Sequence, residues 1–162
     1  MSPEQRRNLL RHPAGWIASG LGSGLSPVAP GTVGSFAALL PWWLVLRQLP
    51  PSTLAAVIVI AFALGTWACA IAGSRLGVAD HGALVWDEFV GMWITLWPLS
   101  FGNANGWWVA AGFAAFRLFD IAKPWPVSWA DRHVKGGLGV MLDDVLAGLY
   151  AALALAVIQR LL

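Results

Sequence analysis

Hydrophobic and polar positions divide the chain into five apolar segments joined by short polar connections. The longest uninterrupted segment is 54–73, "LAAVIVIAFALGTWACAIAG", which matches the roughly 20 apolar residues that a helix needs to cross a bilayer. The other four segments are 34–49, 85–100, 106–121 and 140–158. Those at 34–49, 85–100 and 106–121 are short for a complete span, so they tilt, extend past these bounds or pack inside the bundle.

This pattern predicts an all-α fold: a small polytopic helical membrane bundle with about five apolar helices. We expect one domain over residues 1–162, in which 1–19 is a polar, interfacial N-terminal segment and 20–35 is a glycine-rich loop. The competing interpretation is that the same segments are buried helices of a soluble protein.

Composition favours the membrane interpretation. Apolar residues make up 58% of the chain and charged residues 11%, with a mean hydropathy of +0.67, whereas a soluble domain has about 25% charged residues. The net charge of +2 and the scattered basic residues argue against nucleic-acid binding. The lone Cys69 excludes an internal disulfide and argues against a thiolate metal site. The polar first residues lack the apolar core of a secretory signal, so we expect them to be retained.

Charge placement predicts the topology. If the N-terminus is cytoplasmic and each segment crosses once, most basic residues fall on the inner side, as the positive-inside rule requires, and only Arg47 and Arg160 fall on the outer side. Every acidic residue and every histidine falls on the inner side as well. All groups capable of acid–base or metal chemistry are therefore expected on the cytoplasmic face.

Four polar clusters lie at the predicted inner ends of the segments. Their members are Asp87 and Glu88, then Arg117, Asp120 and Lys123, then Asp143 and Asp144, and finally Thr32 and Ser35 in the glycine-rich loop. The spacing of three residues between Arg117, Asp120 and Lys123 would allow one helix face to carry all three until Pro124 ends the helix. We expect the Asp143–Asp144 pair to open the last helix.

Several carboxylates without cysteine suggest a hard divalent cation, and Mg²⁺ prefers oxygen ligands. Arg117 and Lys123 supply what a phosphate group needs, and backbone N–H groups of the glycine-rich loop would form an anion cradle. The structural alternative is that the acids cap helix N-termini and gain about 0.3–1 kcal/mol from the helix dipole. In the same way, Thr32 and Ser35 would cap a helix.

Three stretches together resemble the bacterial phosphatidylglycerophosphatase A family: "GSGLSPVAPGTVGS", "DHGALVWDEFVGMWITL" and "FRLFDIAKPWPVSWADRHVKGGLGVMLDDVLAG". The resemblance runs from about residue 20 to 148. It implies a Mg²⁺-dependent phosphatase of the bacterial inner membrane, with its active site facing the cytoplasm. Its implied substrate is phosphatidylglycerophosphate, and its products are phosphatidylglycerol and phosphate.

Carried over by position, the acidic motif residues are Asp87, Glu88, Asp120, Asp143 and Asp144, and the others are Arg117, Lys123, Thr32 and Ser35. We assign Glu88, Asp120, Asp143 and Asp144 to the metal shell. Asp87 is either a further ligand or the general base. The residues assigned to phosphate binding are Arg117, Lys123, Thr32 and Ser35. The nucleophile is either water or an aspartate.

Other functions fit parts of the pattern. A phosphatase for phosphatidic or lysophosphatidic acid would use the same groups, whereas a divalent-cation transporter would place its acids near the bilayer midplane. A structural membrane subunit would carry capping charges only. The predicted partner is a phospholipid in the membrane, and nucleic acid is not a predicted partner. The sequence pattern does not indicate the oligomeric state.

Overall fold

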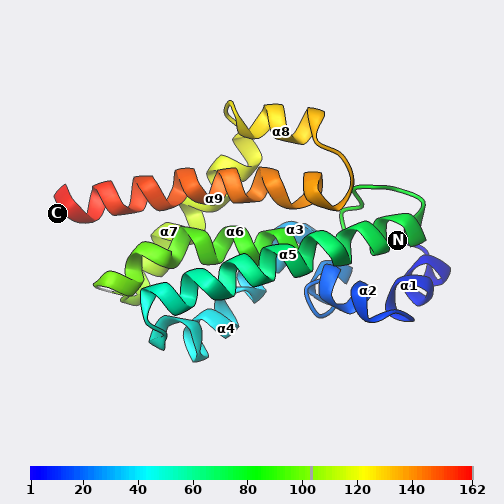
Figure 1. Ribbon diagram of the computed structural model, residues 1–162, viewed down its shortest axis with the longest axis horizontal. Coiled ribbons are helices and arrows are strands. Elements are labelled where there is room, and N and C mark those ends of the chain that lie inside the picture. Colours follow the sequence, from blue (N-terminus) through cyan, green and yellow to red (C-terminus); the bar gives the residue numbers. More distant parts are fainter. Residues whose placement is uncertain (103, 162) are drawn as a thin grey trace.

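Two long antiparallel helices dominate the computed structural model, which describes residues 1–102 and 104–161. They are α5 (Pro51–Leu76) and α9 (Gly136–Leu161), and they lie side by side with the chain termini at opposite ends (Figure 1). Each has 26 residues, which corresponds to about 39 Å at 1.5 Å per residue. Within the described residues these two helices alone are long and apolar enough to cross a membrane, so the prediction of about five such helices is not confirmed.

The third and fourth apolar segments form α6 (Trp86–Leu96) and α7 (Gly106–Ala122). Helix α6 gives way to a 3₁₀ turn, Trp97–Phe101, because Pro98 cannot supply the N–H that the next helical turn would need. Its packing against α9 is very close: a Cβ on Gly148 would lie 2.6 Å from the Gly91 carbonyl oxygen. These glycines bring the polar start of α6 next to the first half of α9.

The first apolar segment does not form one helix. It divides into α3 (Pro30–Ala37), α4 (Leu39–Leu44) and a 3₁₀ turn, Leu46–Gln48. The interruption precedes Pro41, which has no N–H to donate to the carbonyl four residues earlier. The segment therefore bends along the bundle instead of crossing it as a straight rod.

The remaining helices lie around one end of the bundle. Helices α1 (Pro3–Leu10) and α2 (Pro13–Ala18) pack along the C-terminal part of α5, and the loop that follows them contains a short 3₁₀ turn, Ser23–Leu25. Helix α8 (Val127–His133) covers the beginning of α9 (Figure 1). The expected polar N-terminal segment thus forms a two-helix hairpin.

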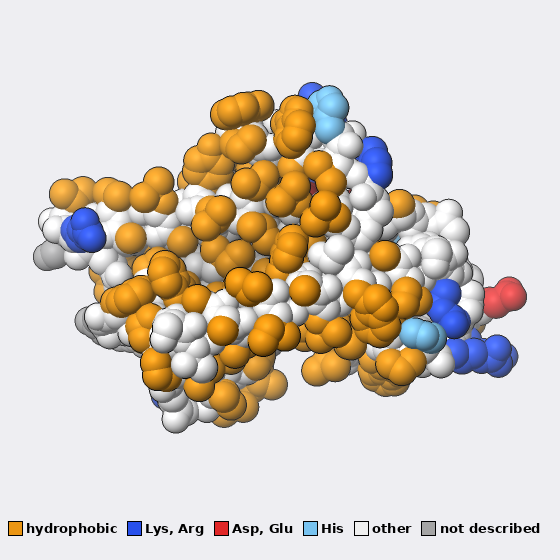
Figure 2. Space-filling view, viewed as in Figure 1, with side chains coloured by type: hydrophobic (Ala, Val, Ile, Leu, Met, Phe, Trp, Pro, Cys, Tyr) orange, Lys and Arg blue, Asp and Glu red, His pale blue; other side chains and the backbone are white. Residues whose placement is uncertain are grey.

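Apolar side chains cover most of the surface between the two ends. Figure 2 shows them in a broad region over α5 and α9, with charged side chains gathered mainly at the end of the N-terminal hairpin. Val59 and Ile60 on α5 are more than 60% exposed, as is Leu153 on α9. Exposed apolar surface of this extent is typical of a membrane protein and unusual for a soluble monomer.

Candidate functional site

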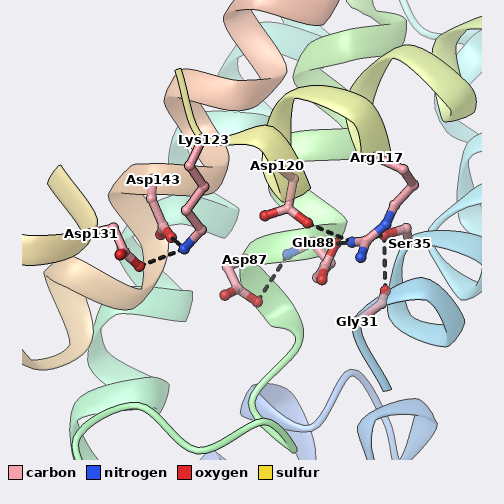
Figure 3. Close-up of polar contacts among 9 residues, drawn as sticks. All are labelled: Gly31, Ser35, Asp87, Glu88, Arg117, Asp120, Lys123, Asp131 and Asp143. Carbon is pink, nitrogen blue, oxygen red and sulfur yellow. Dashed lines mark hydrogen bonds and ion pairs between the residues drawn. The ribbon is translucent and has the colours of Figure 1, made fainter. Parts of the chain in front are cut away.

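The predicted polar clusters converge in the structure. The start of α6, the end of α7, the first half of α9 and helix α3 bring their charged and polar side chains to one region between the helices (Figure 3). Within it the charges form two ion-paired groups, one around Arg117 and one around Lys123.

Arg117 lies at the centre of the first group. Its Nη1 lies 2.6 Å from Glu88 Oε2 and 2.8 Å from Asp120 Oδ2, and it donates a hydrogen bond to the Ser35 hydroxyl at 3.2 Å. The Ser35 oxygen in turn lies 2.5 Å from Glu88 Oε2 and 2.9 Å from the Gly31 carbonyl oxygen, either of which can accept its proton. Helices α3, α6 and α7 together enclose this group, and Arg117 is only 16% exposed.

Lys123 forms the second group. The prediction that it shares a face with Arg117 is wrong, because α7 ends at Ala122 and Lys123 has a left-handed backbone with φ of 42°. Its Nζ instead donates to Asp131 Oδ1 at 2.5 Å and to Asp143 Oδ2 at 2.8 Å. Burial lowers the pKa of Lys123, but these two carboxylates outweigh it and raise that pKa above its ordinary value.

Asp131, on α8, is a member of the cluster that the sequence did not identify. It lies in the motif "ADRHVKGG" beside His133 and Lys135, where it is indistinguishable from ordinary loop charge. The only available signal was its spacing of eight residues from Lys123 across a proline-rich turn. Such a spacing brings two side chains together only when the turn reverses direction.

The two remaining acids of the cluster are Asp87 and Asp144. Asp87 accepts a hydrogen bond at 2.9 Å from the backbone N–H of Glu88, and Asp144 is buried with an Oδ2 atom that has no hydrogen-bond partner in the described residues. The charge of Asp144 interacts with those of Asp87, Glu88 and Asp120. An unpartnered buried carboxylate oxygen among other acids is costly unless a cation joins them.

Burial dominates the electrostatics of the α6 acids. It raises the pKa of Glu88 to about 7, although the Arg117 charge and the Ser35 hydroxyl act in the opposite direction. Burial also raises the pKa of Asp87 well above its usual range, and repulsion from Glu88 adds to this effect. For Glu88, burial therefore outweighs the ion pair with Arg117, and Asp87 forms no ion pair in the described residues.

The donor chemistry of the cluster fits Mg²⁺, since it consists of carboxylate oxygens and includes the unpartnered oxygen of Asp144. A closed shell is not formed by these side chains: across 1–102 and 104–161 no three Asp, Glu, His or Cys groups are arranged to share one ion. Arg117 and Lys123 hold Glu88, Asp120 and Asp143 in ion pairs instead.

Two expectations about helix ends are wrong. Asp143 and Asp144 do not open the last helix, because α9 begins at Gly136, about two turns earlier, and both acids are buried. Neither Thr32 nor Ser35 caps α3, whose N-cap is Ala29 in a left-handed conformation. Capping therefore does not explain the Asp143–Asp144 pair, and a chemical role becomes the stronger interpretation.

The glycine-rich loop approaches the cluster through Gly31. A Cβ at this position would lie 2.2 Å from Glu88 Oε1 and 3.5 Å from Arg117 Nη1, so a larger residue would displace Glu88. Thr32 is exposed, and no contact joins it to the cluster within the described residues. Of the two predicted phosphate-binding hydroxyls, the structure brings only Ser35 to the acids.

Comparison with known proteins adds an independent finding. The sequence profile described as phosphatidylglycerophosphatase A matches residues 16–159. A protein of Escherichia coli named phosphatidylglycerophosphatase A is 49% identical over 84% of this chain and 77% of its own length. A protein of Haemophilus influenzae with the same name is 39% identical over 98% and 95% of the two chains.

A third relative, from Bacteroides thetaiotaomicron, carries the provisional name phosphatidylinositol-3-phosphatase. It is 43% identical over 87% of this chain and 90% of its own length. No solved structure matches the chain significantly.

Proposed function

The chain belongs to the phosphatidylglycerophosphatase A family, and we infer that it hydrolyses the terminal phosphate of phosphatidylglycerophosphate to give phosphatidylglycerol and phosphate. It is thus a phosphoric monoester hydrolase that acts on a membrane phospholipid. The convergence of six carboxylates with Arg117 and Lys123, from segments far apart in the sequence, is the structural observation that supports this chemistry.

We propose that the enzyme requires Mg²⁺. Glu88, Asp120, Asp143 and Asp144 would hold the ion, with Asp87 as a further ligand or as the general base. The ion would supply charge neutralisation for the phosphoryl oxygens. The unpartnered Oδ2 of Asp144 supports this assignment, because it is a buried carboxylate oxygen among other acids with no hydrogen-bond partner in the described residues.

Arg117 and Lys123 would bind the phosphoryl group. Each already forms short, charge-assisted bonds to carboxylate oxygens, and phosphate oxygens present the same type of acceptor. Substrate would take over part of these bonds and release carboxylate oxygens for the cation. Ser35, which accepts from Arg117 and donates within the same group, would keep the guanidinium in position during this exchange.

The site would lie at the cytoplasmic side of the bacterial inner membrane. The supporting observation is the distribution of basic residues along the bundle: helix α1 with Arg6 and Arg7 lies at one end, whereas Arg160 lies near the C-terminus at the other end (Figure 1). A diacyl lipid in that leaflet would present its head group to the cluster.

A broader preference for lipid phosphate monoesters is the second candidate. It is favoured by the Bacteroides relative, whose provisional name specifies a phosphatidylinositol phosphate instead of phosphatidylglycerophosphate. Phosphatidic and lysophosphatidic acid carry the same reacting group and belong to the same candidate.

Phosphate release from the purified, detergent-solubilised protein tests these proposals. We expect rapid release from phosphatidylglycerophosphate with Mg²⁺ and none after chelation, with activity restored by added Mg²⁺. Parallel assays with phosphatidic acid, lysophosphatidic acid and phosphatidylinositol 3-phosphate rank the substrates. Comparable rates on all four would favour the broader preference, and undiminished activity after chelation would refute the metal assignment.

The nucleophile needs a separate experiment. Acid quenching during turnover of ³²P-labelled substrate would leave label on the protein if an aspartate forms an acyl phosphate. Label found only in free phosphate would assign the attack to water.

A further inference from the structure

Four arginines meet where the N-terminal hairpin packs against the end of α5. They are Arg6, Arg7, Arg11 and Arg75, which we call the N-terminal basic surface, and all four are exposed. The side-chain amide of Asn8 joins the two elements by donating to the Arg75 carbonyl oxygen at 2.9 Å. Figure 2 shows the resulting group of basic side chains at one end of the molecule.

These arginines differ from the basic residues of the candidate site in their lack of acidic partners. Arg117 and Lys123 each lie between two carboxylates. Within the described residues none of the four arginines of the N-terminal basic surface forms an ion pair, and Glu4 is the one acid on α1. Exposed guanidinium groups without an acidic partner attract an anionic partner from outside the chain.

Exposed tryptophans show how deep this surface lies relative to lipid. Trp16 and Trp67 are 47% and 46% exposed, and the ring of His12 lies 6.4 Å from that of Trp67. Tryptophan rings prefer the boundary between lipid chains and water. Arg75 follows Trp67 on α5 by about 12 Å of helix, at 1.5 Å per residue, which reaches the level of the phospholipid head groups.

We propose that the N-terminal basic surface binds the head groups of anionic phospholipids in the leaflet that surrounds it. Charge complementarity selects this partner, since basic side chains next to a membrane helix are attracted to anionic lipid within a Debye length. A shallow, open depression of about 380 Å³ lined by Pro3, Arg6, Arg7, Leu10 and Arg11 offers a contact surface for such a head group. This interaction is separate from catalysis and does not depend on the proposed reaction.

Removal of two charges from either end of the molecule tests the proposal. One variant of the full chain carries Arg7→Gln with Arg11→Gln, and the matched control carries Arg47→Gln with Arg160→Gln at the other end. Energy transfer from tryptophan to dansyl-labelled phosphatidylserine in neutral detergent measures binding, with dansyl-labelled phosphatidylcholine as the uncharged reference. Phosphatidylserine is chosen because it carries no phosphate monoester for the candidate site.

We expect wild type to prefer phosphatidylserine, and the Arg7/Arg11 variant to bind it about 25-fold more weakly at low salt, about five-fold for each charge. The control should keep wild-type binding, and 0.5 M salt should abolish the difference. If both variants lose phosphatidylserine binding to the same extent, the net charge of the protein explains the effect, and the proposal is overturned. Wild-type binding in the Arg7/Arg11 variant, or no preference for phosphatidylserine, would also overturn it and would point to another anionic partner, such as an acidic protein.

Phosphate release in neutral detergent, measured on the same preparations, keeps this result separate from the proposed function. An unchanged kcat in the Arg7/Arg11 variant shows that the protein is folded and that only lipid binding has changed. If the wild-type protein releases no phosphate, the proposed reaction is refuted, but the result on lipid binding still stands.

Discussion

Arg117 and Lys123 each bind two carboxylates, but helices fix the first residue and a turn places the second. Arg117 projects from within α7 to partners on α3, α6 and α7 itself. Lys123 follows the last residue of α7, and its partners lie on α8 and α9. The side chain of Lys123 is 33% exposed, twice the 16% of Arg117.

This difference indicates two separate tasks. The Arg117 group joins three packed elements, so it positions the acidic residues as well as any phosphate. The Lys123 group is more open to solvent and depends on one short helix for Asp131, so its bonds can be exchanged at lower cost to the fold. Substitutions in the Arg117 group should therefore lower both activity and stability, whereas substitutions in the Lys123 group should lower activity with a smaller effect on stability.

The largest effect is expected from Glu88→Gln. The change keeps the volume of the side chain but removes the charged acceptor of Arg117 and one proposed metal ligand, so kcat should fall by about 10³-fold. Phosphate release from phosphatidylglycerophosphate measures it, and size-exclusion chromatography in detergent monitors folding. Glu4→Gln, on the exposed face of α1, is the matched control. A folded Glu88→Gln protein with wild-type turnover would remove this residue from the site.

Gly31→Ala should come second, because the new Cβ would lie 2.2 Å from Glu88 Oε1 and force that carboxylate away from its position. We expect a loss of about 10²-fold, in line with the sensitivity of catalysis to displacements of about 1 Å. The control is Gly106→Ala, since an added Cβ meets nothing within 4 Å there. Equal activity in both variants would show that α3 does not support Glu88.

The same two groups show what could be predicted from sequence. The spacing of Arg117 and Asp120 predicts that they share one helix face, and the structure places them there and joins them in an ion pair at 2.8 Å. Periodicity cannot, however, predict where a helix ends in a left-handed residue, and for that reason Lys123 was placed with the wrong partners. Asp131 was missed for the same reason, because its role depends on the turn between α7 and α8.

The fold shows a similar limit. Apolar runs located every major helix, including α5 and α9, but the run at 34–49 could not show that Pro41 divides it into α3 and α4. The polar motif before residue 140 concealed the true start of α9 at Gly136, so Asp143 and Asp144 looked like helix caps. Local pattern identifies elements well, whereas their ends and their tertiary partners depend on contacts between distant residues.

Lys123→Ala should produce a smaller loss than either change near Arg117. One charge-assisted contact to phosphate is worth about 1.5–3 kcal/mol, so kcat/KM should fall by about 30-fold. The Mg²⁺ concentration for half-maximal activity should not rise, because Lys123 does not bind the cation. Steady-state kinetics over a range of Mg²⁺ separates these effects. A change in protein yield alone would refute the phosphate role.

Asp131→Asn should have the smallest effect and the most specific one. Asp131 acts through Lys123, so its loss should lower kcat/KM by about three- to ten-fold, in the range of a partly exposed ion pair. The pH profile gives the sharper test. The carboxylate of Asp131 helps raise the pKa of Lys123, so its removal lowers that pKa. If activity needs the protonated lysine, its alkaline limit then moves to lower pH.

The variant Asp131→Glu separates this positioning role from a purely structural one. A glutamate restores the negative charge near Lys123 Nζ, so it should return the alkaline limit most of the way to that of the wild type, even if kcat/KM recovers only in part. A purely structural role would instead lower the activity of both variants, and Asp131→Glu would not return the alkaline limit, because a displaced α8 no longer brings a carboxylate to Lys123 Nζ. The pH profiles of Asp131→Asn and Asp131→Glu, compared with each other, therefore decide whether the more open of the two groups is tuned by its own carboxylate or only held in place by it.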